Sequence, residues 1–244
     1  MLRRLLLEKI RPCFERGQMI KRVLFSLIES FIRNISGGIG QKIRYLYYKR
    51  RFKRCGSNVR VDIGVVFENP ENIEIGNHVW IMAYSIVIAR PMDFDIKDRV
   101  ERKINNKTFN VHNTSSLKIG NEIQIGVYNI IHGFGGLVIE DRVTLSARVS
   151  IYSHSHYYRD EEAKSKITYA NGMVKNAPIS CIESPIVLEE GSWLGLGVSI
   201  FGGTVKKNSF VTANSVVIGD IEENSYASGN PAVRVKERFI SINE

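Results

Sequence analysis

An aliphatic residue returns about every six positions through most of the chain. The residues between are mostly small or polar, and the segment Leu194-Gly195-Leu196-Gly197-Val198-Ser199 shows the unit. A period of six matches neither the period of two of a strand nor the 3.6 of a helix. It indicates one straight run and one corner every six residues, so that three runs close a triangular coil. Stacked coils bury a continuous aliphatic column, and the pattern therefore predicts a parallel β-helix.

Four tracts keep this period, which makes a β-sandwich with scattered aliphatic residues a poor alternative. Glycine often follows the aliphatic residue at the expected corners, where it accepts a positive φ cheaply. Polar Asn69 stands where one aliphatic residue is expected, and the step from Ile200 to Val205 is one residue short, which requires a tighter corner or a shift in register. The recurring residues are Ile63, Ile75, Ile81 and Val87; Ile119, Ile125 and Ile131; Ile139, Leu145 and Ile151; and Leu188, Leu194, Ile200, Val205, Val211 and Val217, with Gly76, Gly120 and Gly126 at corners.

Charge divides the chain near residue 54. Of the 34 Lys and Arg residues, 15 lie in residues 1–54, whereas only 3 of the 25 Asp and Glu residues do. The net charge of +9 therefore belongs to this N-terminal arm, and the rest supplies no basic groove of the kind that binds nucleic acid. We expect a basic helical arm over 1–54, a β-helix domain over 55–238 and a C-terminal tail over 239–244.

The arm has the apolar spacing of amphipathic helices, with Lys and Arg between the apolar residues. No run of about 18 apolar residues occurs, so no membrane span is expected. Glu8 and Lys9 interrupt the apolar stretch that a secretion signal would need. Two roles stay open for the arm: peripheral contact with an anionic membrane, or packing against the β-helix to help join protomers. The apolar residues are Leu5, Leu6, Ile10, Ile20, Leu24, Leu27, Ile28 and Phe31.

The three cysteines, Cys13, Cys55 and Cys181, are odd in number and form no Cys-x-x-Cys motif. This usage fits reduced thiols in the cytosol. We therefore expect a cytoplasmic protein, with the inner face of the membrane as the place that the arm could contact.

Three segments interrupt the period, and chemistry is expected there because regular coils are structural. Two are long, at about 90–114 and 153–184, and one is short, at 133–136. The second long segment opens with Ser153-His154-Ser155-His156. Loops of this length on a compact solenoid are usually functional, so these two histidines are the leading candidates for chemistry. The tract from Ser228 to Lys236 is expected to cap the open end of the β-helix.

Several short motifs are specific enough to suggest a family. They are Asn72-Ile73-Glu74-Ile75-Gly76-Asn77, Ser153-His154, Ser192-Trp193-Leu194-Gly195, Ala213-Asn214-Ser215-Val216-Val217 and Gly229-Asn230-Pro231-Ala232. From about residue 40 to 238 the chain resembles the hexapeptide-repeat acyltransferases, and within them the branch that O-acetylates sugars and polysaccharides. The resemblance implies a left-handed coil, an exception to the usual crossover rule. It also implies a homotrimer with active sites between protomers, and acetyl-CoA bound along the β-helix edge.

The resemblance further implies a histidine general base at the root of the long loop. His154 matches that position, and His156 is the second choice. A neutral imidazole can take the proton of a sugar hydroxyl during attack on the thioester, an effect of about 10²–10⁴ in rate. The backbone N–H of Leu196 is the implied oxyanion donor.

The other implied residues bind the two substrates, and no metal is required. Ile218-Gly219 stand where relatives often carry a Thr-Lys pair, which puts that phosphate contact in question. The implied acceptor-binding residues are His132, Trp193 and Tyr157, and the implied acetyl-CoA-binding residues are Trp193, Gly195, Ala213, Asn214, Ser215, Pro231, Arg234 and Lys236.

We therefore predict direct transfer of acetyl from acetyl-CoA to a sugar hydroxyl, in a surface polysaccharide or its precursor. An N-acyltransferase acting on an amino sugar or an antibiotic is the main alternative. A metal-dependent hydratase on the same solenoid needs three histidine ligands, and the five histidines here do not match that family's spacing. A non-catalytic trimeric scaffold is the remaining alternative.

Overall fold

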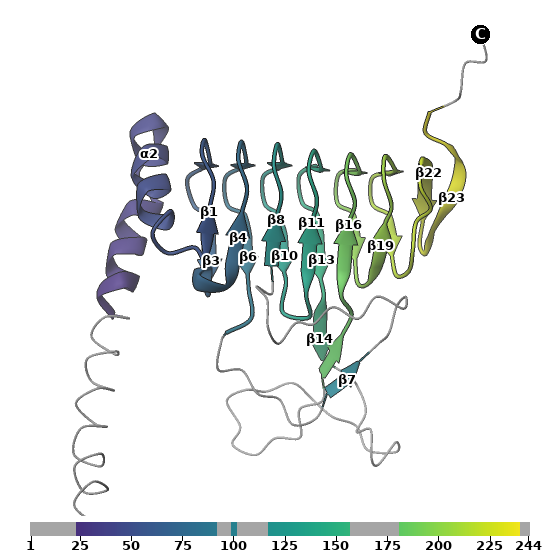
Figure 1. Cartoon of the computed structure of the whole chain (residues 1–244), viewed down its shortest axis with the longest axis horizontal. Coiled ribbons are helices and arrows are strands. Elements are labelled where there is room, and N and C mark those ends of the chain that lie inside the picture. The colour runs from purple at the N-terminus through teal and green to yellow at the C-terminus, as the bar shows by residue number, and fades with distance from the viewer. Residues whose placement is uncertain (1–22, 92–98, 102–116, 157–180, 240–244) are drawn as a thin grey trace, which may run out of the picture.

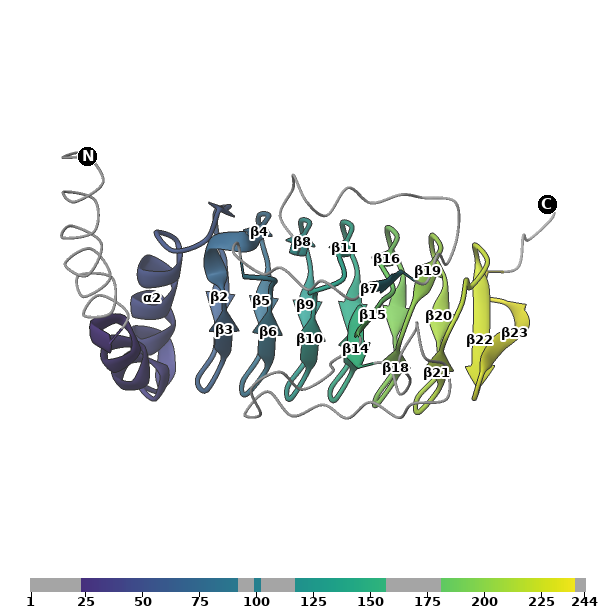
Figure 2. The same cartoon turned by 90° about the horizontal axis from the view of Figure 1, so that it is seen from below.

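The computed structural model describes residues 23–91, 99–101, 117–156 and 181–239. Its body is a column of stacked coils, in which each coil adds one short strand to each of three parallel sheets (Figure 1). N-terminal helices lie at one end of the column, and β22 and β23 lie at the other (Figure 2). Tyr157 and the apolar residues before position 23 lie outside the described residues.

The three sheets, here named A, B and C, follow one another around every coil. Sheet A contains β1 (Arg54–Cys55), β4 (Ile73–Ile75), β8 (Leu117–Ile119), β11 (Leu137–Ile139), β16 (Ile186–Leu188) and β19 (Gly203–Val205). Sheet B contains β2 (Arg60–Val61), β5 (Trp80–Ile81), β9 (Gln124–Ile125), β12 (Thr144–Leu145), β17 (Trp193–Leu194), β20 (Phe210–Val211), β22 (Ser225–Gly229) and β23 (Ala232–Glu237). Sheet C contains β3 (Val66–Glu68), β6 (Ile86–Ile88), β10 (Ile130–His132), β13 (Ser150–Tyr152), β18 (Ser199–Ile200) and β21 (Val216–Val217).

The predicted aliphatic column is confirmed for nearly all of its residues, which are buried inside the triangle. Two positions in the first tract are wrong. Val61 and Phe67 are buried in this coil, whereas Ile63 lies in the turn after β2. Asn69 occupies a corner with a φ of 54°, where its side-chain amide donates to the Ala89 carbonyl at 2.8 Å. The short 3-10 helix η1 (Pro70–Asn72) follows, so that this coil is longer than three six-residue runs.

Glycine stands at the corners for a reason different from the expected one. Gly76, Gly120 and Gly126 do not have positive φ; the left-handed residue lies two positions later, as at His78 and Glu122. A Cβ atom on Gly76 would lie 2.4 Å from the Gly120 carbonyl oxygen of the next coil. These positions favour glycine because neighbouring coils pass closely.

The short step between Ile200 and Val205 is a tightened corner, which is one of the two alternatives that the sequence left open. Gly203 begins β19 with a φ of 92°, and a Cβ atom there would lie 2.4 Å from the backbone of Gly219. Only glycine turns the chain in so few residues at this distance. Val205 is therefore buried in register with Leu188, and the column continues.

The N-terminal end of the column is covered by a helix over residues 23–33 and by α2 (Gly37–Tyr48). Tyr48 is buried against Phe52 and Phe67, with ring centroids 5.7 and 4.6 Å away. Arg44 is also buried, and it donates to the carbonyls of Val61 and Ile35. Burial lowers the pKa of its guanidinium, although the charge of Asp62 opposes this effect. The helices are thus tied to the first coil, and the division at residue 54 stays a prediction.

At the other end, β23 pairs antiparallel with β22 and forms the edge of sheet B. This arrangement covers the last coil, as expected for the tract that follows Ser228.

Candidate functional site

The histidines lie at the corner where the chain leaves sheet C for sheet A. β10 and β13 run side by side, which pairs His132 with Tyr152. Two residues later the chain leaves the column as β14 (His154–His156), which pairs antiparallel with β15 (Cys181–Glu183). β15 in turn pairs with β7 (Arg99–Glu101), so that the order in this small sheet is β14–β15–β7 (Figure 1). The two long interruptions of the repeat therefore meet in one small sheet next to the histidines.

Four rings are stacked at this corner. The His132 ring lies 4.7 Å from Phe134, 5.6 Å from His154 and 5.7 Å from Tyr152, measured between centroids. Phe134 also lies 5.3 Å from His154, so that both histidines contact the same aromatic ring. His154 is only 8% exposed in the single chain. The structure thus brings together two predicted site residues and adds Phe134, from the short interruption, to them.

Burial is the main cause that lowers the pKa of His132; a backbone hydrogen bond at His132 opposes it, and the nearby His156 adds a smaller lowering effect. The buried surroundings of His132 therefore favour the uncharged form of its imidazole.

Ser153 fixes the chain between the two histidines. Its hydroxyl donates to the His132 carbonyl at 2.9 Å and accepts from the Gly135 N–H at 3.0 Å. A Cβ atom on Gly135 would lie 1.9 Å from the Ser153 carbonyl oxygen, so this position of the short interruption requires glycine. The Gly-Phe-Gly-Gly segment is thereby bound to the root of the long loop.

A buried ion pair joins the two long interruptions next to His154. Arg90 contacts Glu183, and their side chains are 8% and 7% exposed. Glu183 lies opposite His154 in the β14–β15 pairing. The sequence analysis missed this pair, because both residues lie at the ends of irregular segments whose approach depends on the fold.

His156, the second choice for the general base, lies at the other end of β14. It is exposed, and its Nδ1 atom lies 3.9 Å from the Cys181 sulfur. Cys181 is buried, and it pairs with His156 across the strands. The two candidate histidines therefore differ in surroundings: His154 lies among aromatic rings, and His156 lies beside a thiol.

The residues expected to bind acetyl-CoA lie elsewhere on the coil. Trp193 is 43% exposed on the outer face of sheet B, and its Nε1–H donates to the Ser146 hydroxyl at 3.0 Å. Phe210 lies edge-on to Trp193 at 5.6 Å, and Tyr226 follows it in the next coil at 5.4 Å. The Lys236 ammonium lies 4.8 Å from the centre of the Tyr226 ring. Trp193 and Lys236 thus lie at the two ends of one aromatic row.

Gly195, Leu196, Ala213 and Asn214 lie in stacked turns between sheets B and C. The Leu196 carbonyl accepts from the Asn214 N–H at 2.8 Å, and a Cβ atom on Gly195 would lie 2.7 Å from the Ala213 nitrogen. Within the described part of the chain nothing accepts a hydrogen bond from the Leu196 N–H. The same is true of the equivalent amides of the turns before it, such as Ala147. The Leu196 N–H would therefore differ from these other amides by its position in the fold and not by its hydrogen bonding.

Three further predicted residues have different surroundings. Ser215 is buried, and its hydroxyl pairs with that of Thr212 and accepts from the Gly229 N–H. Pro231 is exposed in the turn between β22 and β23. Arg234 is exposed on β23 and pairs with Glu237 at 3.0 Å.

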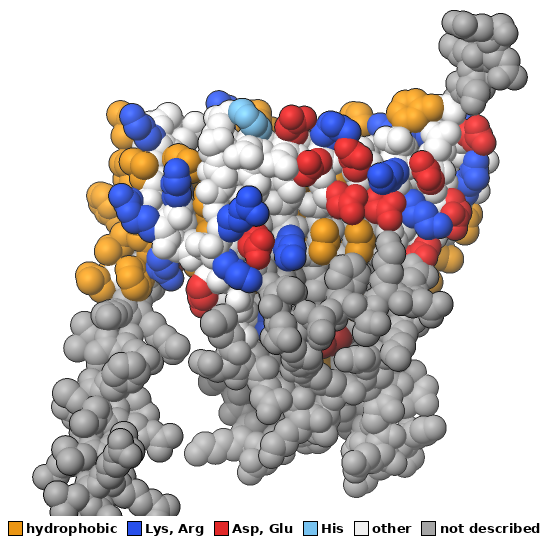
Figure 3. All heavy atoms as spheres, viewed as in Figure 1, with side chains coloured by type: hydrophobic (Ala, Val, Ile, Leu, Met, Phe, Trp, Pro, Cys, Tyr) orange, Lys and Arg blue, Asp and Glu red, His pale blue; other side chains and the backbone are white. Residues whose placement is uncertain are grey.

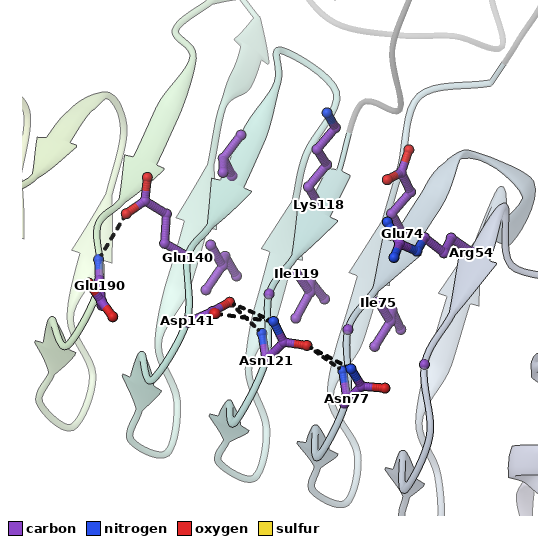
Figure 4. Close-up of a pocket in the computed structure, with 15 residues that line it drawn as sticks. Arg54, Glu74, Ile75, Asn77, Lys118, Ile119, Asn121, Glu140, Asp141 and Glu190 are labelled. Atoms are coloured by element: carbon purple, nitrogen blue, oxygen red, sulfur yellow. Dashed lines mark hydrogen bonds between the residues drawn. The ribbon is translucent and has the colours of Figure 1, made fainter.

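The histidines and Leu196 do not meet in one protomer. Leu196 lies at the corner between sheets B and C, whereas the histidines lie at the corner between sheets C and A. The width of sheet C separates them. A groove of about 500 Å³ lies on a third part of the surface, at the corner between sheets A and B (Figure 4). It contains Lys118, Asn121 and Glu140, and none of the predicted site residues lines it.

The chain is similar to curated acyltransferases. It is 29% identical over 199 residues to the dTDP-4-amino-4,6-dideoxy-D-glucose acyltransferase of Escherichia coli, covering 77% of this chain and 83% of the relative. It is 31% identical over 146 residues to the putative lipopolysaccharide biosynthesis O-acetyl transferase WbbJ of Escherichia coli K12, covering 52% of this chain and 74% of the relative. No family model matches the chain.

Solved structures share the fold. AntD, an N-acyltransferase from Bacillus cereus in complex with dTDP and 3-hydroxybutyryl-CoA, superposes with a TM-score of 0.60 at 18% identity, covering 80% of this chain and 88% of AntD. A hexapeptide-repeat acetyltransferase from Vibrio cholerae gives a TM-score of 0.50 at 20% identity, covering 90% of this chain and 91% of the other. These structures confirm the expected left-handed parallel β-helix. With its six-residue period, its stacked three-sided coils and its likeness to these enzymes, the chain belongs to the hexapeptide-repeat acyltransferase family.

Proposed function

We propose that this acyltransferase moves an acetyl group from acetyl-CoA to a hydroxyl of a sugar, in a surface polysaccharide or its precursor, with His154 as general base. The observation that carries the proposal is the stacking of His154 on His132 and Phe134 at the root of the long loop. These neighbouring rings limit where the imidazole of His154 can lie. A base in such a position is poised for one proton transfer.

The reaction is a direct transfer. His154 takes the proton of the acceptor hydroxyl while the oxygen forms a bond to the thioester carbonyl carbon. The negative charge that develops on the carbonyl oxygen needs a donor, and the Leu196 N–H has no partner in the described residues. When the intermediate collapses, the carbon–sulfur bond breaks and the CoA thiolate takes the proton from the imidazolium. The products are an O-acetyl sugar and CoA.

Acetyl-CoA would lie along sheet B and its turns. The row from Trp193 through Phe210 and Tyr226 to Lys236 offers an apolar strip with a cation at its end. This combination suits a long thiol arm that ends in phosphates. The relative AntD was crystallised with 3-hydroxybutyryl-CoA, which supports an acyl-CoA donor.

We propose a homotrimer in which each active site lies between two protomers. His154 and Leu196 lie at opposite corners of sheet C, so a site that uses both needs one of them from a neighbour. The outer face of sheet C is suited to such contact, since it presents Val66, Ile86, Ile130 and Val216, and Glu68 at the end of β3 is the one Asp, Glu, Lys or Arg residue in its strands. Apolar faces of this kind are usually covered by another copy or by a ligand.

Transfer to an amino group is the second candidate, and the relatives favour it as much as O-acetylation. The relative that matches most of this chain acts by its name on a dTDP-linked amino sugar, and AntD was crystallised with dTDP. The relative with the higher identity of the two is named as an O-acetyl transferase. The same base would serve both reactions, because an ammonium acceptor must also lose a proton.

The two candidates differ in the bond that they form. The full-length enzyme would be incubated with acetyl-CoA and either dTDP-4-amino-4,6-dideoxyglucose or an oligosaccharide with free hydroxyls. The products would then be treated with mild alkali, which cleaves esters but leaves amides intact. Acetate released from the oligosaccharide product supports O-acetylation. An alkali-stable product formed only from the amino sugar supports N-acylation, and the absence of both products contradicts the proposal.

A further inference from the structure

Among the described residues, the contacts of the helix over residues 23–33 with α2 come from one of its faces. The guanidinium of Arg51 lies 4.3 Å from the centre of the Phe25 ring, and Glu29 binds both Arg51 and the Tyr47 hydroxyl. Ile32 completes this face and is buried. The helix is therefore packed on α2 through residues spaced by three or four positions.

A neighbouring face of this helix is an exposed apolar stripe. Leu24, Leu27, Ile28 and Phe31 are 54%, 65%, 37% and 74% exposed. Their spacing of three and four residues places them on one side of the helix. Ile39, at the start of α2, is also 74% exposed. Figure 3 shows hydrophobic side chains gathered over the N-terminal helices, with Lys and Arg between them.

The charge around the stripe is almost entirely positive. Lys42, Lys49 and Arg50 are exposed on α2 and directly after it. Residues 23–54 contain one acidic residue, Glu29, and it is paired with Arg51. The exposed cations are therefore not neutralised within this part of the chain.

We propose that this helix stripe and the basic residues of α2 bind the surface of an anionic lipid bilayer. Exposed apolar side chains flanked by Lys and Arg are suited to a membrane interface, where the apolar groups enter the boundary and the cations remain among headgroups. No helix within the described ranges is long and apolar enough to cross the bilayer.

A second copy of the chain is a poorer occupant of the stripe. Residues 1–54 carry 15 basic and 3 acidic residues, so stripes from two copies would bring like charges together. An anionic bilayer removes that repulsion and covers the apolar side chains at once.

The contacts of Arg44 make substitutions in the stripe a better test than deletion of the helix. Its guanidinium donates to the carbonyls of Ile32 and Ile35, at 3.0 and 2.7 Å, and so fastens the end of the helix to the first coil. Deleting residues 1–35 would remove these acceptors and leave a buried cation with fewer partners. Substitutions in the stripe leave Arg44 and the packed face intact and are the sharper test.

The full-length protein would be mixed with phosphatidylcholine vesicles, with or without phosphatidylglycerol, and floated on a density gradient. We expect binding to the anionic vesicles only, and weaker binding as salt is added. The pair Leu27→Ser and Phe31→Ser should lower the bound fraction about tenfold or more. Each of Lys42→Gln, Lys49→Gln and Arg50→Gln should lower it about fivefold. Val233→Ser with Val235→Ser, at equally exposed apolar positions of β23, is the matched control and should bind as the parent does.

Light scattering on the same variants shows whether the stripe binds a membrane or joins copies of the chain. A stripe variant that keeps the mass of the parent in solution but no longer binds the vesicles supports the proposal. Parent protein that ignores anionic vesicles overturns it, as does a stripe variant that still binds them. A stripe variant that falls apart into monomers, with no vesicle binding by the parent, would show that the stripe joins copies of the chain.

Discussion

The imidazole rings of His132 and His154 lie 5.6 Å apart and 27° from parallel, although His132 ends a strand of the column and His154 begins a strand outside it. Ser153 makes this possible by binding the His132 carbonyl as the chain turns away. One histidine thus belongs to the rigid coil and the other to the small sheet of the insertions.

His154→Ala should lose most transfer activity while its CoA affinity and mass in solution stay close to those of the parent. A lost general base costs about 10²–10⁴ in rate, whereas CoA is expected to bind along sheet B. Turnover and CoA binding would be measured for this variant and for His156→Ala. Full turnover in His154→Ala together with loss in His156→Ala would move the base two residues along β14.

Cys181→Ala should keep the activity of the parent. The thiol is buried, and the proposed transfer has no acyl-enzyme, so its contact with His156 has no place in the reaction. Turnover of the variant and mass spectrometry of the parent with acetyl-CoA alone would test this. An acetylated peptide containing Cys181 would overturn direct transfer.

The titration of His132 should make the folded state lose stability as the pH falls below about 6.5, the usual pKa of histidine. Burial lowers the pKa of His132 in the folded protein, so the unfolded chain takes up the proton first and is favoured in the window between the two pKa values. His132→Phe keeps the stacking but cannot titrate. Its free energy of unfolding, measured with urea between pH 7.5 and 5.5, should fall less than that of the parent. Equal slopes would mean that His132 protonates in the folded state as readily as in the unfolded chain.

Arg90→Met or Glu183→Leu alone should destabilise the protein by about 3–5 kcal/mol, because each leaves a buried charge without its main partner. The double variant should recover much of this loss, since two apolar side chains replace the pair. Thermal unfolding measures both. If the ion pair also positions His154, the double variant will fold with a reduced kcat and an unchanged KM for acetyl-CoA. Recovery of the parent's kcat would leave the pair a purely structural role.

Ile130→Asp should dissociate the proposed trimer and abolish activity. Ile130 lies on the outer face of sheet C, and a charge there would be desolvated by a neighbouring copy. Val138→Asp, on the outer face of β11 in sheet A, is the matched control. Mass from light scattering and turnover would be compared. If only Val138→Asp dissociates the trimer, the protomers contact one another through sheet A, and the proposed contact through sheet C is wrong.

The sequence determined the fold of this protein because its period is local. Six residues make one run and one corner whatever happens elsewhere, so positions such as Leu194, Ile200 and Val217 could be assigned to the column without coordinates. The same local period also revealed the shortened step before Val205. It failed at Ile63, where two runs of six compete and only packing shows that Val61 points inward. It also failed for Gly76, since close approach to Gly120 is a contact between coils.

The sequence marked the histidines of the site but not their surroundings. His154 is visible because it stands where the period stops, and Trp193 because of the motif around it. The neighbours of His154 come from segments far apart in the chain: Phe134 from the short interruption, and Arg90 and Glu183 from the two long ones. No local rule brings these segments together, because their approach depends on how the coils stack and on pairing between strands outside the column. Only the tertiary structure decided that His154 and Leu196 lie at different corners, which is why the proposed site needs a second protomer.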